Sequence, residues 1–253
     1  MDVYACLIGK SQRKHHFMFH MSKQSDEVTL VYPFWVLSAK GHAPILVDTG
    51  FAHDIATHHG VGDYRDPSES LAALGIAPEE IKLIVVSHLH YDHFGVPERF
   101  PNAEFVLQAE DVDYFTRRGL GHPACGLADP KSLGQLVELR KAGRVRELSG
   151  DAELAPGVRA VHVGGHTPGM QVTVLDTGTE RLVLACDASH FYANLETNTP
   201  TAVIHNYEAY ESGFETIKRE AQGGRWLPGH DPKMLETMKQ VQSGIYHVSG
   251  SAG

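Results

Sequence analysis

Four potential metal ligands lie within one short segment, SHLHYDHFG, at residues 87–95. They are His88, His90, Asp92 and His93, and they follow an apolar run, IKLIVV, that predicts a buried strand. Neutral imidazole and carboxylate are ligands for a divalent ion such as zinc, whereas the same side chains are costly to bury without a partner. In an H-x-H-x-D-H pattern the two alternate histidines can face one side and the Asp-His pair the other. The spacing therefore predicts two metal ions side by side.

The rest of the chain supplies the ligands that this segment lacks. A zinc ion takes about three or four protein ligands, so each half of the segment needs help. His166 in VGGHTPGM, Asp187 in VLACDASH and His230 in LPGHDP each stand at a predicted strand end or turn. Asp187 is the candidate bridge, because a carboxylate has two oxygens and can hold two ions about 3.5–4 Å apart. A water shared by such ions loses a proton near neutral pH, so the predicted reaction is hydrolysis by a metal-bridging hydroxide.

Strands and helices interleave along the chain and must position these ligands. Apolar, β-branched runs bounded by turn residues predict strands at 28–39, 43–48, 82–87, 103–108, 158–163, 170–176 and 181–187. Apolar periodicity and stop residues predict helices at 67–75, 109–119, 129–143 and 210–224. No linker or repeat divides the chain, so we expect an α/β (α+β) fold in a single domain over 1–253. We also expect a helical insertion around 109–147 and a loose tail about 247–253.

The composition argues against several classes of partner. The chain has 253 residues, a formal net charge of −9 and no long run of Lys or Arg, which argues against nucleic acid. No apolar run approaches about 18 residues, and the N-terminal segment lacks the order of a signal peptide. We therefore expect a cytoplasmic protein without a membrane partner. The three cysteines are far apart, which argues against a disulfide framework. Both a monomer and a homodimer remain open.

Taken together, the motifs from LVDTG at 46–50 to PGHD at 228–231 resemble the metallo-β-lactamase superfamily. This resemblance implies an αββα sandwich, in which two facing sheets carry helices outside and metals at one edge. It also implies a ligand assignment: His88, His90 and His166 for the first ion, Asp92, His93 and His230 for the second, and Asp187 between them. Asp48 in LVDTG resembles the family's supporting carboxylate, which orients the outer ring nitrogen of a ligand. The structural alternative is an Asp that caps the turn before Thr-Gly.

Within the superfamily the chain resembles the N-acyl homoserine lactonase branch most. The shared features are H-L-H-[YF]-D-H, FPNAEFVLQAED, GGHTPGMQ and the D-A-S segment that begins at Asp187. The resemblance implies opening of a lactone ring, with an acyl-homoserine lactone as the first substrate, as in quorum quenching. Asp92 would pass a proton to the ring oxygen that leaves. Five histidines and two carboxylates suit two Zn²⁺ ions best, although iron, manganese or cobalt would accept the same ligands.

One position departs from that branch. Lactonases of this kind carry a tyrosine three residues after the bridging aspartate, whereas this chain has His190 there, with Tyr192 two residues further on. Either side chain could donate a hydrogen bond to the oxyanion, and His190 is the first choice. The alternative is that His190 is a supporting or surface histidine and that Tyr192 packs in the core.

Two other activities remain open. A glyoxalase II-like thioesterase shares all seven ligands, but that family carries a helical region where this chain has only a short segment after His230. A lactonase for a different, non-homoserine lactone would keep the same chemistry. The N-terminal segment KHHFMFHM, with His15, His16 and His20, could cover a substrate, although an exposed strand or loop is the plainer interpretation.

Overall fold

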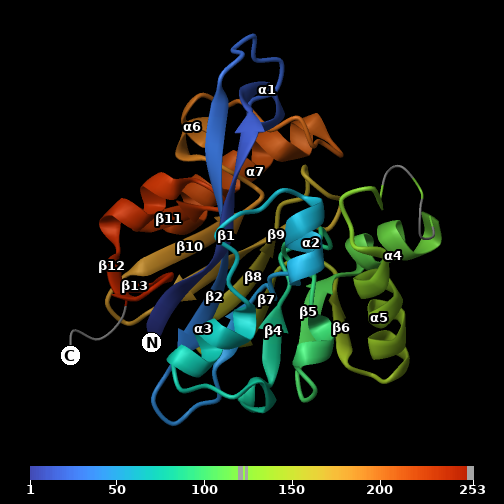
Figure 1. Ribbon diagram of the computed structural model, residues 1–253, viewed down its shortest axis with the longest axis vertical. Helices are drawn as coiled ribbons and strands as arrows, with labels where there is room; N and C mark the ends of the chain where they lie inside the picture. The colour runs from blue at the N-terminus through green and yellow to red at the C-terminus, as the bar shows by residue number, and fades with distance from the viewer. Residues whose placement is uncertain (119–121, 123–124, 250–253) are drawn as a thin grey trace.

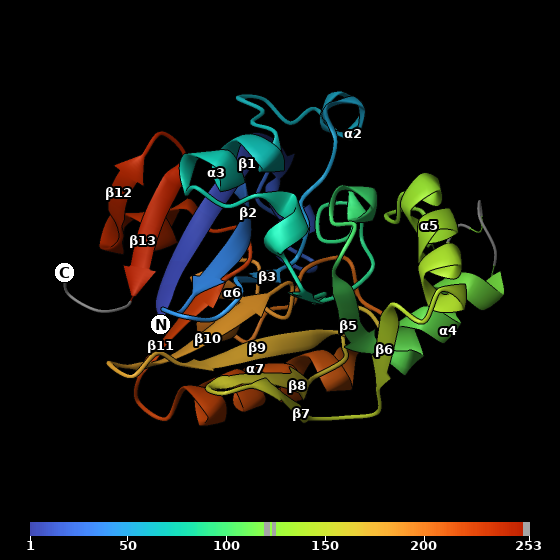
Figure 2. The same cartoon turned by 90° about the horizontal axis from the view of Figure 1, so that it is seen from below.

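The computed structural model of the chain describes residues 1–118, 122 and 125–249. Within these residues two β-sheets pack face to face, with helices on the outer faces of both (Figure 1, Figure 2). This arrangement confirms the αββα sandwich expected from the sequence.

The larger sheet has eight strands and the smaller has five among the described residues. The order of the larger sheet is β12 (Lys239–Gln242), β13 (Ile245–Ser249), β1 (Asp2–Lys14), β2 (Glu27–Ser38), β3 (Ile45–Val47), β4 (Leu83–Val85), β5 (Glu104–Gln108) and β6 (Val145–Leu148). The order of the smaller sheet is β11 (Arg225–Pro228), β10 (Arg181–Cys186), β9 (Gln171–Asp176), β8 (Val158–His162) and β7 (Ala152–Ala155). Strands β3 to β6 are parallel to one another, and so are β10 and β11.

Helices cover the two outer faces. Figure 2 shows α7 under the smaller sheet and α2 and α3 on the opposite side of the molecule. The α-helices are α1 (His15–Met18), α2 (His53–His58), α3 (Pro67–Ala73), α4 (Ala109–Arg118), α5 (Pro130–Lys141), α6 (Tyr192–Glu196) and α7 (Tyr207–Ala221). Short 3₁₀ turns are η1 (Pro78–Glu80), η2 (Pro97–Arg99) and η4 (Pro232–Thr237). In the part of the chain that the structure describes, no helix has the length and apolar character needed to cross a membrane.

Strand β2 explains how the sequence builds the layers. Alternate residues of a strand point to opposite faces of the sheet. Leu30 and Phe34 belong to the cluster under the outer helices, whereas Val31 and Trp35 belong to the cluster that contains the apolar residues of the smaller sheet. Both faces are buried, so the strand is a continuous apolar run and was readily predicted.

All seven predicted strands and all four predicted helices occur, with ends that shift by a few residues. Two expectations need correction, and six of the described strands, β1, β6, β7, β11, β12 and β13, were not predicted. The insertion does not reach residue 147, because β6 begins at Val145 and joins the larger sheet beside β5. The segment from residue 247 to 249 is not a loose tail, because it belongs to β13, which pairs with β1; residues 250–253 lie outside the described part of the chain. Strand β1 was missed, because its last five residues, KSQRK, have no apolar side chain.

Strands β1 and β2 continue beyond the sheet as a hairpin that carries α1 at its tip (Figure 1). The pairing runs without a break from Gly9 with Tyr32 to Lys14 with Glu27. The hairpin tip also contacts the segment before α7, because the Phe17 carbonyl accepts a hydrogen bond from the Ala202 amide at 2.9 Å. It therefore overhangs the edge of the sandwich where the predicted ligands lie.

Candidate metal centre

The strand ends that carry the predicted ligands meet at one edge of the sandwich. His88 and the residues that follow it come after β4, Asp187 comes directly after β10, and His230 follows β11. His166 lies in the turn between β8 and β9. Because β10 and β11 are parallel neighbours, their C-terminal ends lie side by side, as those of β3 and β4 do in the other sheet. All seven predicted ligands are buried there.

Three ring nitrogens and one carboxylate oxygen converge in a first set. His90 Nδ1 lies 2.9 Å from His88 Nε2 and 3.0 Å from His166 Nε2. Asp187 Oδ2 lies 3.1 Å from His166 Nε2 and 3.6 Å from His88 Nε2. Ligand atoms around a tetrahedral zinc ion with bonds of about 2.0–2.1 Å are separated by about 3.3 Å. The four atoms therefore fit one such ion.

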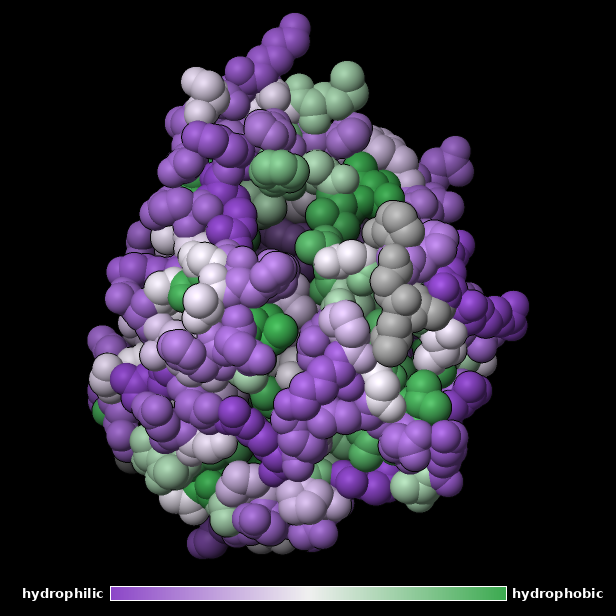
Figure 3. All heavy atoms as spheres, turned by 45° about the vertical axis from the view of Figure 1, so that its right-hand side comes forward, coloured by the Kyte–Doolittle hydropathy of each residue, from purple (hydrophilic) through white to green (hydrophobic). Residues whose placement is uncertain are grey.

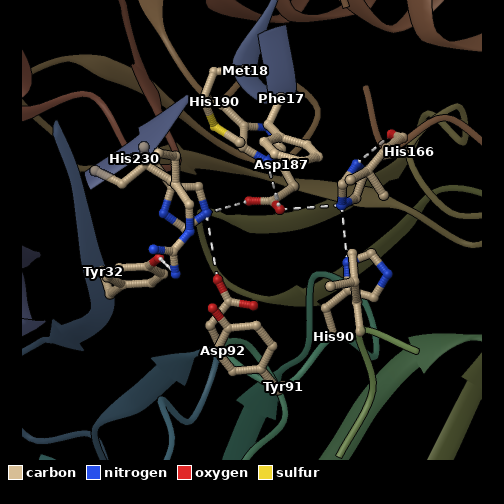
Figure 4. A pocket seen from close by; sticks show the side chains of 14 residues that line it. Phe17, Met18, Tyr32, His90, Tyr91, Asp92, His166, Asp187, His190 and His230 are labelled. Atoms are coloured by element: carbon tan, nitrogen blue, oxygen red, sulfur yellow. Dashed lines mark hydrogen bonds and ion pairs between the residues drawn. The ribbon is translucent and has the colours of Figure 1, made fainter. Parts of the chain in front are cut away.

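A second set forms on the other oxygen of the same carboxylate. Asp187 Oδ1 lies 3.1 Å from His93 Nε2 and 2.8 Å from His230 Nε2. Asp92 Oδ2 completes the set at 3.5 Å from His93 Nε2 and 3.6 Å from His230 Nε2. Figure 4 shows Asp187 at the centre, with one oxygen toward His230 and the other toward His166. Asp187 thus divides its two oxygens between two ligand sets, as a bridging carboxylate does.

His166 and His230 each turn Nδ1 toward a backbone carbonyl and Nε2 toward the other ligands. His166 Nδ1 lies 3.0 Å from the Val203 carbonyl, and His230 Nδ1 lies 2.8 Å from the Val31 carbonyl. A carbonyl only accepts, so each Nδ1 carries a proton, and in the form of the ring that binds metal each Nε2 keeps a lone pair. In His166 that lone pair points at another histidine nitrogen, and in both rings it points at a carboxylate oxygen of Asp187. Lone pairs that face one another in a buried site require a cation between them, so the donor set fits a pair of metal ions.

Asp48 orients one of the second-set ligands. Its Oδ2 accepts a hydrogen bond from His93 Nδ1 at 2.7 Å and one from Ser87 Oγ at 3.0 Å, while its Oδ1 accepts from the Ser87 amide at 2.7 Å. Asp48 has a φ of 64°, in the left-handed region that Asp tolerates better than most residues. His93 Nε2 is buried and forms no well-aligned hydrogen bond within the described part of the chain, with Asp187 Oδ1 3.1 Å away. Asp48 therefore aims that nitrogen at the second set.

Two histidines of the first set, His88 and His90, are neutral near pH 7. Burial lowers the pKa of His88 well below its usual value, and the neighbouring His93 and His90 lower it further. Burial likewise lowers the pKa of His90, with a further contribution from His166. A neutral imidazole is the form that binds metal, so these ligands need not lose a proton first.

The second set carries more charge. Burial favours a neutral His93, but Asp92, Asp187 and Asp48 outweigh it and raise the pKa of His93 well above its usual value. Burial raises the pKa of Asp92, yet His93 outweighs that effect and the pKa falls to about 2. Burial also opposes ionisation of Asp187, but His190, His93 and His230 hold its pKa well below the usual range. Without metal, the ionised carboxylates of Asp92 and Asp187 therefore face the proton on His93, and a metal ion would replace that proton.

Comparison with known proteins agrees with this site. A family model described as the Metallo-beta-lactamase superfamily matches residues 29–240. The chain belongs to the metallo-beta-lactamase superfamily. The N-acyl homoserine lactonase AttM of Azorhizobium caulinodans is 33% identical over 249 residues, which cover 90% of this chain and 91% of that protein. An N-acyl homoserine lactonase from a Bacillus species is 28% identical over 203 residues, or 74% of each chain. A crystal structure of a quorum-quenching N-acyl homoserine lactone lactonase shares the fold, with a TM-score of 0.80 at 22% identity over 95% of this chain and 96% of that one.

His190 lies inside this metallo-beta-lactamase site, and the ring of Tyr192 does not. His190 Nε2 is 3.1 Å from Asp187 Oδ2, and burial lowers the pKa of His190 to about 4. The ring is therefore neutral near pH 7, not the imidazolium that could donate to a substrate as well as to Asp187. The Tyr192 ring packs against Trp226 with ring centroids 4.9 Å apart and does not line the cavity. Tyr192 therefore lies away from the cavity, whereas His190 contacts Asp187.

A cavity of about 260 Å³ opens over the two ligand sets. Its lining includes the apolar side chains of Phe17, Met18, Leu30, Leu127 and Val203 and the polar side chains of Arg13, Tyr32 and Tyr91. Figure 3 shows a hollow with a hydrophilic floor and hydrophobic side chains gathered around part of its rim. Figure 4 shows Phe17 and Met18 above the ligands, with Tyr32 and Tyr91 on the other side.

The N-terminal segment therefore contributes to the site. Phe17 is 50% exposed and Met18 is buried, and both line the cavity. This position favours the substrate-covering interpretation of KHHFMFHM over an exposed loop without contact to the site. His15, His16 and His20 are not among the residues that line the cavity.

Asp111 is a functional candidate that sequence reasoning missed. It lies in the first turn of α4 and is fully buried, and its Oδ1 accepts from the Gly169 amide at 2.6 Å. Its Oδ2 accepts from Thr167 Oγ1 at 3.0 Å, so the carboxylate holds the turn that carries His166. Burial raises the pKa of Asp111 to about 6 in spite of these bonds. An Asp in a first helical turn usually complements the helix dipole, so the sequence gave no distinct signal.

Close backbone contact explains the glycine before His230. A Cβ on Gly229 would lie 2.7 Å from the Cys186 carbonyl oxygen and 2.9 Å from Asp187 Oδ1. Only glycine lets β11 approach the end of β10 closely enough to bring His230 against Asp187. The motif P-G-H-D therefore has a packing reason as well as a ligand.

Proposed function

We propose that this chain is a binuclear metal-dependent lactonase that opens the ring of an N-acyl homoserine lactone. The observation that carries the proposal is the division of the two Asp187 oxygens between two converging ligand sets. Relatives that span most of the chain, at 33% and 28% identity, are named N-acyl homoserine lactonases, and this supports the substrate class.

The ligand assignment follows the two sets. His88, His90 and His166 would hold one ion, Asp92, His93 and His230 the other, and Asp187 would bridge them. We propose zinc, because imidazole and carboxylate in a tetrahedral arrangement suit it. When bound, the two ions would lower the pKa of a shared water and polarise the lactone carbonyl.

Residues around the cavity supply positioning and proton transfer. Asp92 lines the cavity, and because its pKa lies at about 2 it is ionised at neutral pH. It can accept a proton at a carboxylate oxygen and return it to the ring oxygen that leaves. His190 holds Asp187 Oδ2 and so fixes the direction of the bridge. Phe17 and Met18 would exclude water from one side of a bound substrate.

The space beside the ligand sets leaves room for an acyl chain next to the lactone ring. The cavity has a volume of about 260 Å³, and a second cavity of about 410 Å³ shares His90, Leu127, His166 and Val203 with it. Apolar side chains of the lining can pack against an acyl chain. We therefore propose an N-acyl substituent with an apolar chain, whose preferred length the following comparison of substrates measures.

The test is proton release by the zinc-loaded protein at neutral pH. The panel holds N-butanoyl, N-hexanoyl and N-dodecanoyl homoserine lactone, an unsubstituted γ-lactone and S-lactoylglutathione. Fast turnover of the acyl-homoserine lactones supports the proposal. Turnover of the γ-lactone alone would keep the chemistry and change the substrate, and turnover of the thioester alone would make the chain a thioesterase.

We also propose, from composition and organisation, that the chain is a single domain that works in the cytoplasm as a monomer or homodimer.

A further inference from the structure

The cavity contains a cation that the proposed reaction does not use. Arg13 lies near the end of β1, is half-buried, and lines the cavity together with Tyr32, Tyr91 and Asp92. No carboxylate among the described residues forms an ion pair with it. Its three hydrogen bonds go to neutral acceptors: the Gln12 carbonyl at 3.0 Å, the His59 carbonyl at 2.6 Å and Tyr32 Oη at 3.3 Å.

These contacts fix the guanidinium and leave part of it free. A guanidinium has five N–H donors, so three hydrogen bonds leave two for a ligand. The tethers are themselves held, because Tyr32 Oη lies 2.8 Å from Ser11 Oγ and the His59 ring stacks on Tyr91 with centroids 3.7 Å apart. The guanidinium of Arg13 is therefore held in place before a ligand binds, which lowers the entropy cost of binding.

A fixed positive charge that forms no ion pair among the described residues, in a cavity that is also lined by apolar side chains, is a site for an anion. Charges are stable in partly dry surroundings when they are paired and hydrogen-bonded, and guanidinium suits carboxylate best. The ligand sets lie on the floor of the same cavity of about 260 Å³, so a substituent of a few atoms would reach from the lactone ring to Arg13.

We infer that Arg13 is a specificity-determining residue that binds a carboxylate on the substituent of the lactone. This inference rests on the proposed function and narrows its substrate class to acyl-homoserine lactones whose acyl group ends in a carboxylate. Tyr32 and Tyr91 form the polar wall beside it, while Phe17 and Leu30 line the same cavity.

The test compares N-succinyl homoserine lactone with its neutral isostere, N-succinamoyl homoserine lactone. A charged hydrogen-bonded contact changes binding by about 10- to 100-fold. The zinc-loaded protein should therefore show a kcat/KM at least about 10-fold higher for the succinyl substrate. Arg13→Gln should remove that preference through a higher KM for the succinyl substrate, with kcat and the succinamoyl rates retained. Arg13→Lys should restore part of the preference, because it keeps the charge without the planar fork.

Arg144 provides a matched control. It also donates to carbonyl oxygens, those of Phe100 and Ala103, but it lies outside the cavity. Arg144→Gln should leave the ratio of the two substrates unchanged. Equal rates for both substrates in the wild type, or a preference that survives Arg13→Gln, would overturn the inference.

Failure of the proposed function is measured separately. Calorimetric binding of ring-opened N-succinyl-homoserine and its succinamoyl analogue to the zinc-loaded protein requires no turnover. If no lactone is hydrolysed but the succinyl acid binds at least about 10-fold more tightly in an Arg13-dependent way, Arg13 is confirmed as a carboxylate-binding residue while the lactonase proposal, and with it the assignment of a lactone substrate, falls. If N-butanoyl homoserine lactone is hydrolysed without any preference for the succinyl group, only the inference falls.

Discussion

Replacement of Asp48 by Asn tests how the second ligand set is oriented. The carboxylate accepts three hydrogen bonds from Ser87 and His93. An amide has only one acceptor oxygen, so one orientation places its NH₂ against the Ser87 amide and the other against His93 Nδ1. Loss of such a supporting contact costs about 10- to 100-fold in metal affinity, or about 1.4–2.7 kcal/mol. The cost should fall on the second ion, because His93 belongs to that set.

Asn is also the right substitution for the backbone. Asp48 has a φ of 64°, and Asn tolerates the left-handed region whereas Ala would add strain. Asp63 supplies a matched control, since it has a φ of 51° and its ion pair with Lys10 is exposed. Competition with a chromophoric chelator should show one weakened binding constant for Asp48→Asn and two unchanged constants for Asp63→Asn. Unchanged constants for Asp48→Asn, or equal weakening of both, would refute the reasoning.

Three further expectations concern groups around the bridge. Since burial raises the pKa of Asp111 to about 6 from an ordinary value of about 4, its ionisation opposes folding as the pH rises through that interval. Urea denaturation gives the free energy of unfolding of metal-free Asp111→Asn and of the metal-free wild type. Between pH 4 and 7 the variant should gain about 3 kcal/mol of stability relative to the wild type. A difference that does not change with pH would count against this. His190→Ala should lower zinc occupancy as well as kcat, whereas Tyr192→Phe should leave kcat within about twofold; the reverse order would restore Tyr192 as the donor. The raised pKa of His93 means that it holds a proton at neutral pH without metal, so filling the second set should release about one proton, measured by calorimetry in buffers of different ionisation enthalpy. No proton release would contradict the charge assigned to His93.

The sequence was most informative where chemistry and secondary structure coincide. His88 and His166 stand just beyond predicted strands, Asp187 ends another, and His230 lies in a predicted turn; parallel strand ends meet at one sheet edge. Their convergence could therefore be expected before any coordinates were known. Asp48 was expected only from the resemblance of LVDTG to the family motif, and it does directly follow β3.

Residues that act through long-range packing could not be predicted in this way. Arg13 looked like part of a short basic segment, because nothing local shows that β1 pairs with β2 and overhangs the ligands. Asp111 looked like an ordinary helix-start acid, and its contact with the turn at Thr167 joins residues 56 positions apart. Tyr192 was a reasonable donor from its distance along the chain, but α6 turns its ring toward Trp226. Sequence distance from a ligand thus does not determine which side chains face a cavity.

The most direct measurement of the central claim is a zinc titration of the metal-free protein, with ring opening of N-hexanoyl homoserine lactone recorded at each addition. Two ligand sets that share Asp187 predict that activity rises until two equivalents of zinc are bound and then stays constant. In Asp187→Ala, the protein should retain fewer than two ions and lose most of its activity. A plateau at one equivalent, or two tightly bound ions in Asp187→Ala, would contradict the binuclear centre.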